Sequence, residues 1–128
     1  MIVAGIGCRS GVGAAEVEAA IAAALLQRCV TGDELGRIAI PSAKAHESGV
    51  VAAAAGRRIP IVLIAQDALE AASEHTVSRS SRAMAAMNVN SVAEAAALAG
   101  AGVHSRLLGP RVVVGPVTCA LAKGEFQP

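Results

Sequence analysis

The N-terminal segment constrains the fold most strongly, because three local patterns follow one another there. The run "IVAGIG" at residues 2–7 is short, apolar and rich in glycine, which is typical of a buried strand in a parallel sheet. Gly11 and Gly13 then end a tight loop, and residues 14–29 carry Val17, Ile21 and Leu25 on one helical stripe. A strand, a glycine loop and a helix in this order predict an α/β fold.

The middle of the chain continues this alternation. The unbroken apolar character of "IPIVLIA" indicates a strand that is buried on both faces. Ser91 and Glu94 in "SVAE" form a capping box, in which the Glu94 carboxylate accepts a backbone hydrogen bond. We predict strands over residues 37–41 and 59–65 and helices over residues 42–56, 67–73 and 91–100, with Ser42 capping the first of these helices. Most of the polar stretch "SEHTVSRSSR" at residues 73–82 is predicted to be a loop.

The C-terminal part predicts an antiparallel ending. Two apolar runs in "RLLGPRVVVG" are separated only by Gly109 and Pro110, and a turn this short cannot carry a parallel crossover. Residues 117–123 are predicted to form a closing helix with Thr118 near its N-terminus. We therefore expect one domain over residues 1–128: a three-layer α/β/α sandwich with a mixed, mostly parallel sheet ending in an antiparallel hairpin.

Composition argues against nucleic-acid and membrane partners. The formal net charge is +1 and Phe126 is the only aromatic residue, so neither a phosphate footprint nor base stacking is expected. The apolar runs are shorter than the roughly 20 residues that span a bilayer, and we predict no signal peptide.

Cysteine and histidine spacing argues against disulfides and metal. The three cysteines are scattered without a CxxC pair, which fits a reducing cytosol and predicts a cytoplasmic protein: Cys8, Cys29 and Cys119. The three histidines are far apart in sequence and show no metal-ligand spacing: His46, His75 and His104. We expect no metal site.

The glycine loop suits an anion, because backbone N–H groups lie at the positive end of the following helix. Ser10 occupies the place of the third glycine of a dinucleotide fingerprint, and the second strand ends in "IPS" at residues 40–42 without the acidic residue that binds a ribose. A P-loop lysine is also missing, so we expect no nucleotide cofactor. The loop can also be a plain turn, but Arg9 beside Ser10 favours recognition of a carboxylate.

Other polar residues should gather near this loop, because ligands of open α/β sheets bind at the carboxyl ends of the strands. Together they form a rim of cations and hydrogen-bond donors that suits a small molecule with many carboxylates. The residues of this rim are Ser42, Lys44, Glu47, Ser78, Arg79, Ser81, Arg82, Asn88, Asn90, Ser91 and Thr118.

Two carboxylates of the rim are candidates for general acid or base chemistry, Glu47 and Glu94. The alternatives are structural: Glu94 completes a helix cap, and Glu47 pairs with Lys44 on one helical face. Cys8 beside Arg9 is a weaker candidate nucleophile, since no histidine neighbours it in sequence.

Four motifs in this order resemble the CobE / CbiG C-terminal domain family of cobalamin (vitamin B12) biosynthesis: "GIGCRSG", "SAKAHESG", "NVNSVAEAAAL" and "VTCALA". The resemblance implies a cytoplasmic α/β/α domain that works on the corrin pathway, whose macrocyclic intermediates are edged with acetate and propionate groups. The family motifs fall on Gly5, Gly7, Cys8, Arg9, Gly11, Lys44, Glu47, Val92, Ala93, Glu94 and Thr118.

The chain departs from the family pattern in two places. Ser10 stands where the family loop often has lysine, and Arg111 is the nearest basic residue to a lysine that often follows the late hairpin. In CbiG proteins, which are associated with opening a ring lactone, further domains precede this one. None precedes it in this sequence, so the resemblance is greatest to the stand-alone CobE members.

We therefore expect the chain to bind a tetrapyrrole intermediate, a precorrin or corrinoid, and to assist or present it to pathway enzymes. The expected ligand-binding residues are Gly7, Cys8, Arg9, Ser10, Gly11, Lys44, Ser91 and Thr118. One alternative is a hydrolase or isomerase of the macrocycle that uses Glu47 or Glu94. Another is a small module that contacts a neighbouring pathway enzyme without touching the ligand.

Overall fold

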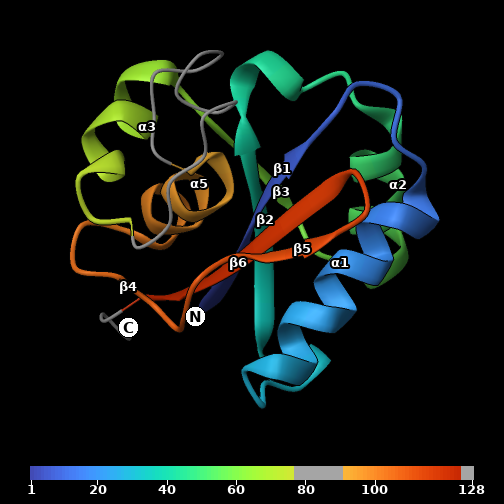
Figure 1. Cartoon of the computed structure of the whole chain (residues 1–128), viewed down its shortest axis with the longest axis horizontal. Coiled ribbons are helices and arrows are strands. Elements are labelled where there is room, and N and C mark those ends of the chain that lie inside the picture. Colours follow the sequence, from blue (N-terminus) through green and yellow to red (C-terminus); the bar gives the residue numbers. More distant parts are fainter. Residues whose placement is uncertain (77–90, 125–128) are drawn as a thin grey trace.

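The computed structural model describes residues 1–76 and 91–124, which form a six-stranded mixed sheet between two layers of helices (Figure 1). The predicted three-layer α/β/α architecture is confirmed. The strand order is β3-β2-β1-β6-β4, and β5 also pairs with β6. Within these residues, no helix has both the length and the apolar composition needed to cross a membrane. The elements are β1 (Ile2–Cys8), α1 (Ala14–Gln27), β2 (Leu35–Pro41), α2 (Ser48–Arg57), β3 (Ile61–Ile64), α3 (Gln66–Ser73), α5 (Val92–Ala101), β4 (Arg106–Leu107), β5 (Val112–Val114) and β6 (Val117–Lys123).

Alternation along β1 divides the interior between the two faces of the sheet, since successive side chains of a strand point to opposite sides. Ala4 and Ile6 belong to the apolar core that α1 and α2 cover. Val3 packs on the other face, in the core that includes residues of α3 and α5. Because β1, β2 and β3 are parallel, their carboxyl ends meet at one edge of the sheet.

Helix α5 packs directly on the backbone of β1, and Gly5 allows this approach. A methyl group on Gly5 would lie 2.0 Å from the carbonyl oxygen of Ala93 and 2.4 Å from the amide nitrogen of Ala97. Both distances are far inside van der Waals contact, so any larger residue at position 5 forces the helix away from the sheet.

The predicted closing helix over residues 117–123 is wrong, because Val117–Lys123 form β6. This strand pairs antiparallel with β1 and places Thr118 opposite Gly7. Most residues of β6 are buried, on both faces of the sheet, and its sequence is therefore almost continuously apolar. Such a run cannot be distinguished from a buried helix by periodicity alone.

The predicted position of the hairpin turn is also wrong. The chain reverses at Gly115 and Pro116, where Gly115 has a φ of +57°, and β5 then pairs antiparallel with β6. The segments on either side of Gly109 and Pro110 are β4 and β5, which both pair with β6 rather than with each other. The sheet does end in an antiparallel hairpin, but its strands are β5 and β6, so the predicted pairing of the two runs around Gly109 and Pro110 with each other is wrong.

Two further elements differ from expectation. The third strand is an edge strand, and Leu63 is 51% exposed, so burial on both faces is wrong. Helix α2 begins at Ser48 with Glu47 as its N-cap, whereas Ser42 opens a separate 3-10 turn. The expected cap of Ser42 on a long helix is therefore also wrong.

Burial of the Cys119 thiol makes the folding stability pH-dependent in the alkaline range. Burial raises the pKa of the Cys119 thiol from 9.0 to about 12, while the positive charge of Arg57 acts in the opposite direction. Between these pH values the unfolded chain loses a proton that the folded chain keeps, so stability falls as pH rises. We expect a loss of roughly 1.4 kcal/mol per pH unit from this thiol, measured by urea unfolding at a series of pH values. A Cys119→Ala variant should show a shallower dependence, and equal slopes for the two proteins would contradict this assignment.

Candidate functional site

Three segments meet at the edge of the sheet where β1 and β2 end: the loop of residues 9–13, the segment of residues 42–47 and the start of α5. We call this region the carboxyl edge. The two loops leave parallel neighbouring strands at this edge. Helix α5 begins there, since Gly7 near the end of β1 lies against Val92 and Ala93. Thr118 lies opposite Gly7 in the sheet and so belongs to the same edge.

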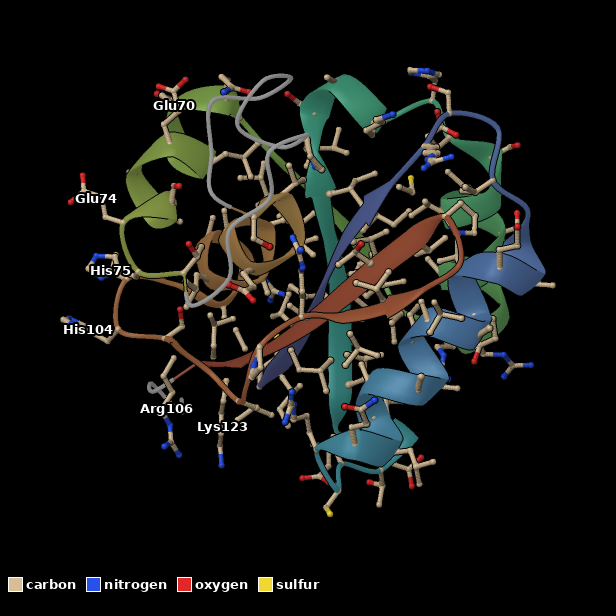
Figure 2. The ribbon with its side chains drawn as sticks, viewed as in Figure 1. Glu70, Glu74, His75, His104, Arg106 and Lys123 are labelled. Atoms are coloured by element: carbon tan, nitrogen blue, oxygen red, sulfur yellow. The ribbon has the colours of Figure 1, made fainter. Side chains whose placement is uncertain are left out.

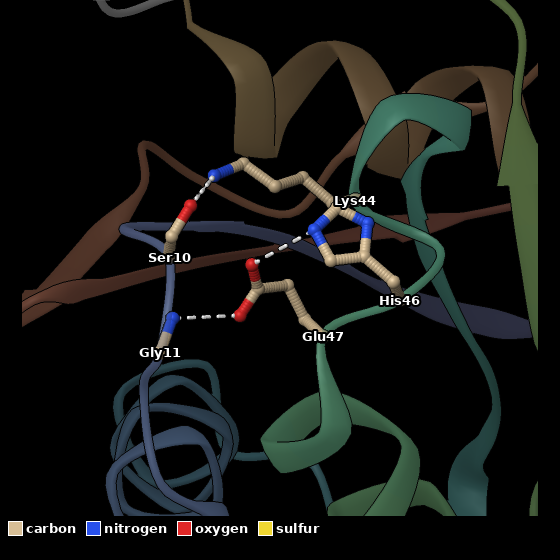
Figure 3. Close-up of polar contacts among 5 residues, drawn as sticks. All are labelled: Ser10, Gly11, Lys44, His46 and Glu47. Atoms are coloured by element: carbon tan, nitrogen blue, oxygen red, sulfur yellow. Dashed lines mark hydrogen bonds and ion pairs between the residues drawn. The ribbon is translucent and has the colours of Figure 1, made fainter.

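The glycine loop is held by a carboxylate from the neighbouring segment. The amide nitrogen of Gly11 donates a hydrogen bond of 2.9 Å to Oε1 of Glu47 (Figure 3). Gly11 has a φ of +83°, a conformation that favours glycine. The Glu47 side chain is 4% exposed, and its Oε2 lies 3.7 Å from Nε2 of the exposed His46. Glu47 therefore links the loop after β1 to the start of α2.

Gly49 tightens the same junction and was missed by sequence reasoning. A methyl group on Gly49 would lie 2.2 Å from the carbonyl oxygen of Val12 and 2.9 Å from the carbonyl carbon of Gly13. The first turn of α2 thus presses directly on the backbone of the loop. A glycine inside the first turn of a helix is unfavourable unless packing requires it, and this was the available signal.

Lys44 lies on the other side of the loop. Its Nζ is 3.4 Å from Oγ of Ser10, a long hydrogen bond (Figure 3). The predicted pairing of Lys44 with Glu47 on one helical face is wrong, because Lys44 lies in the 3-10 turn before α2. Among the described residues, the Lys44 ammonium forms no ion pair with a carboxylate.

Arg9 is exposed at the start of the loop. Its backbone amide donates a hydrogen bond of 3.4 Å to the carbonyl oxygen of Pro116. In the part of the chain that the structure describes, its guanidinium makes no hydrogen bond or ion pair with another side chain. The carboxyl edge thus carries two basic groups, on Arg9 and Lys44, that carboxylates of the described residues leave unpaired.

Cys8 ends β1 beside these groups and is half-buried. Burial raises the pKa of the Cys8 thiol, the Glu47 charge raises it further, and the Lys44 charge lowers it. The thiol is therefore protonated near neutral pH, which does not suit a nucleophile. The opposing effects of Glu47 and Lys44 also mean that both charges act at the same end of β1.

Ser91 and Glu94 at the start of α5 make two hydrogen bonds, one within the helix cap and one to a distant segment. Oγ of Ser91 accepts the amide of Glu94 at 3.4 Å, so the predicted N-cap is confirmed. The Glu94 carboxylate is fully buried, and its Oε2 accepts the backbone amide of Arg111 at 2.8 Å. The Glu94 carboxylate thereby ties α5 to the segment before β5, a long-range contact that the capping pattern does not predict.

The expected ligand donors have different surroundings in the structure. Arg9, Ser10 and Gly11 are exposed on the loop, whereas Ser91 is 1% exposed. The expected rim residues Ser78, Arg79, Ser81, Arg82, Asn88 and Asn90 lie outside the described residues. The roles of the remaining residues toward a ligand stay predictions.

Residues 2–122 match the protein family described as "Cobalamin synthesis G C-terminus". A curated relative, Protein CobE from Sinorhizobium sp, is 33% identical over 121 residues, which cover 94% of this chain and 79% of the relative.

Three solved structures of cobalamin biosynthesis proteins are also similar to this chain. The crystal structure of CobE, a protein from the cobalamin (vitamin B12) biosynthetic pathway, has a TM-score of 0.90 and 32% identity, covering 95% of this chain and 89% of that one. Cobalamin biosynthesis protein chiG from Agrobacterium tumefaciens str. C58 gives a TM-score of 0.75 and 38% identity, covering 98% of this chain and 100% of that one. A putative cobalamin biosynthesis protein G homolog from Sulfolobus solfataricus shares the fold at 21% identity and a TM-score of 0.70, with 97% of this chain covering 37% of that one.

Proposed function

Since the chain belongs to the cobalamin synthesis G C-terminus family and takes part in cobalamin biosynthesis, we propose that it binds a polycarboxylated precorrin or corrinoid intermediate at the carboxyl edge. The bound macrocycle is then presented to other enzymes of the pathway. One observation carries this proposal: the basic groups of Arg9 and Lys44 lie at one edge without carboxylate partners among the described residues.

The chemistry of the ligand class supports this reading. Acetate and propionate groups around a macrocycle present several carboxylates at fixed spacing, and each can accept hydrogen bonds from a guanidinium or an ammonium. Arg9 offers a planar set of donors to a carboxylate, while Lys44 offers a single charged group beside the Ser10 hydroxyl. Two separated cations at one edge suit a ligand that carries its charges on a rim.

The positions of the two candidate acid-base residues favour binding over catalysis. Glu47 accepts the Gly11 amide and Glu94 accepts the Arg111 amide, and both side chains are buried. A carboxylate that holds a backbone amide in this way is occupied by a structural task. A hydrolase or isomerase activity of the macrocycle therefore has less support than binding.

Removal of the Arg9 guanidinium tests the proposal. We expect Arg9→Ala to weaken binding of a cobalt-free corrin polycarboxylate, hydrogenobyrinic acid, by roughly 1.5 to 3 kcal/mol, the range for hydrogen bonds to charged groups. The measurement is an absorbance titration at fixed ionic strength, because screening by salt weakens exposed charge pairs.

Arg58→Ala is the matched control, since Arg58 is exposed at the far end of α2 from Glu47. It should bind as the wild type does. Equal affinities of the Arg9→Ala and wild-type proteins would remove Arg9 from the binding site.

A further inference from the structure

We infer that Glu47 is a positioning residue that fills the anion site of the glycine loop from within the protein and leaves the carboxylate of a ligand to Lys44 and Arg9. This inference rests on the proposed function, and it adds which groups of the carboxyl edge are open to a ligand. It also assigns the buried carboxylate a role other than proton transfer.

The first support is the geometry of the loop amides. Glu47 accepts the Gly11 amide at 2.9 Å, and Oε1 of Glu16 accepts the Gly13 amide at the same distance. Two N–H groups that would otherwise attract a phosphate or carboxylate are therefore already bound to carboxylates of the protein. An incoming anion at Gly11 would have to displace a like-charged group that is almost completely buried.

The second support is the rigidity of the junction. Glu47 is the N-cap of α2, and two residues later Gly49 is in contact with the backbone of Val12 and Gly13. The carboxylate and the loop are thus held from both sides, and the loop conformation, including the left-handed Gly11, is set by this contact.

The third support is the placement of charge. Glu47 and Lys44 both act electrostatically on the Cys8 thiol, in opposite directions. A ligand carboxylate at Lys44 is therefore repelled by the negative charge of Glu47. The hydrogen bond of Glu47 holds the loop in place, while its negative charge repels the ligand. Replacement by glutamine separates these two effects, because it keeps an acceptor oxygen and removes the charge.

The experiment compares Glu47→Gln with Glu47→Ala by two readouts. Hydrogen exchange of the Gly11 amide, followed by NMR, reports the loop contact without any ligand. Absorbance titration with hydrogenobyrinic acid reports the affinity of the carboxyl edge for a corrin.

Glu47→Gln keeps an acceptor oxygen, so exchange of the Gly11 amide should stay within about threefold of the wild-type rate. Glu47→Ala removes the acceptor and should speed this exchange about tenfold or more. Glu47→Gln should bind the corrin about threefold more tightly, since a repulsive charge is removed, and Glu47→Ala should bind it more weakly.

Glu34→Gln is the control, because Glu34 also accepts a backbone amide, that of Thr31, but is exposed and lies before β2. It should change neither readout. Weaker corrin binding by Glu47→Gln, or unchanged Gly11 exchange in Glu47→Ala, would overturn the inference. Absence of corrin binding by the wild type would instead refute the proposed function, while Gly11 exchange would still decide whether Glu47 holds the loop.

Discussion

A Gly5→Ala variant is expected to lose about 3 kcal/mol or more of its folding free energy, the upper part of the range for overpacking. The added methyl group would lie 2.0 Å from the carbonyl oxygen of Ala93 and 2.9 Å from Cα of Ala97. Both atoms belong to the backbone of α5, so no side-chain rotation relieves the contact. Separation of α5 from β1 would also open the apolar layer that contains Val3.

The measurement is urea unfolding followed by far-UV circular dichroism, since the chain has no Trp or Tyr to report unfolding by fluorescence. Gly56→Ala is the matched control, because a methyl group there meets nothing within 4 Å. Alanine at this exposed helical position should raise stability by up to about 1 kcal/mol. A Gly5→Ala protein as stable as the wild type would contradict the close packing of α5 on β1.

Combined replacement of Arg9 and Lys44 by alanine is expected to abolish retention of the corrin intermediate. Each charged hydrogen bond contributes roughly 1.5 to 3 kcal/mol, so loss of both weakens binding by about 3 to 6 kcal/mol if they act independently. Folding should be little affected, since Arg9 is exposed and Lys44 only partly buried. The measurement is the corrin absorbance that stays with the protein through gel filtration after co-expression with the pathway.

The matched control replaces Arg58 and Arg106 by alanine. It removes the same number of positive charges, but from positions that lie away from the carboxyl edge. Arg106 lies on β4 beside Lys123, at the opposite end of the sheet (Figure 2). This double variant should retain pigment as the wild type does. Equal loss in the two double variants would show that net charge, rather than these two positions, determines binding.

Sequence reasoning succeeded where the signal was local. The strand over residues 2–7 and the helix that follows it are recognised by a glycine loop between an apolar run and an amphipathic stripe, and both are present as β1 and α1. The Ser91 cap of α5 is equally local, because its partner amide is three residues away. The order of motifs along the chain was sufficient to indicate the family.

The remaining errors concern contacts between residues far apart in sequence. β6 lies between β1 and the β4 and β5 strands, and this pairing decides that its apolar run is a strand rather than a helix. Glu47 reaches Gly11 across 36 positions, and Glu94 reaches Arg111 across 17. A capping pattern predicts the backbone near such a residue but not the distant amide that its carboxylate accepts.

Retention of a corrin pigment by the wild-type protein tests the central claim most directly. Purified from cells that produce the corrin intermediates, the wild type should carry the absorption spectrum of a corrinoid or precorrin in a constant ratio to protein. A colourless wild-type protein from pigmented cells would contradict binding at the carboxyl edge.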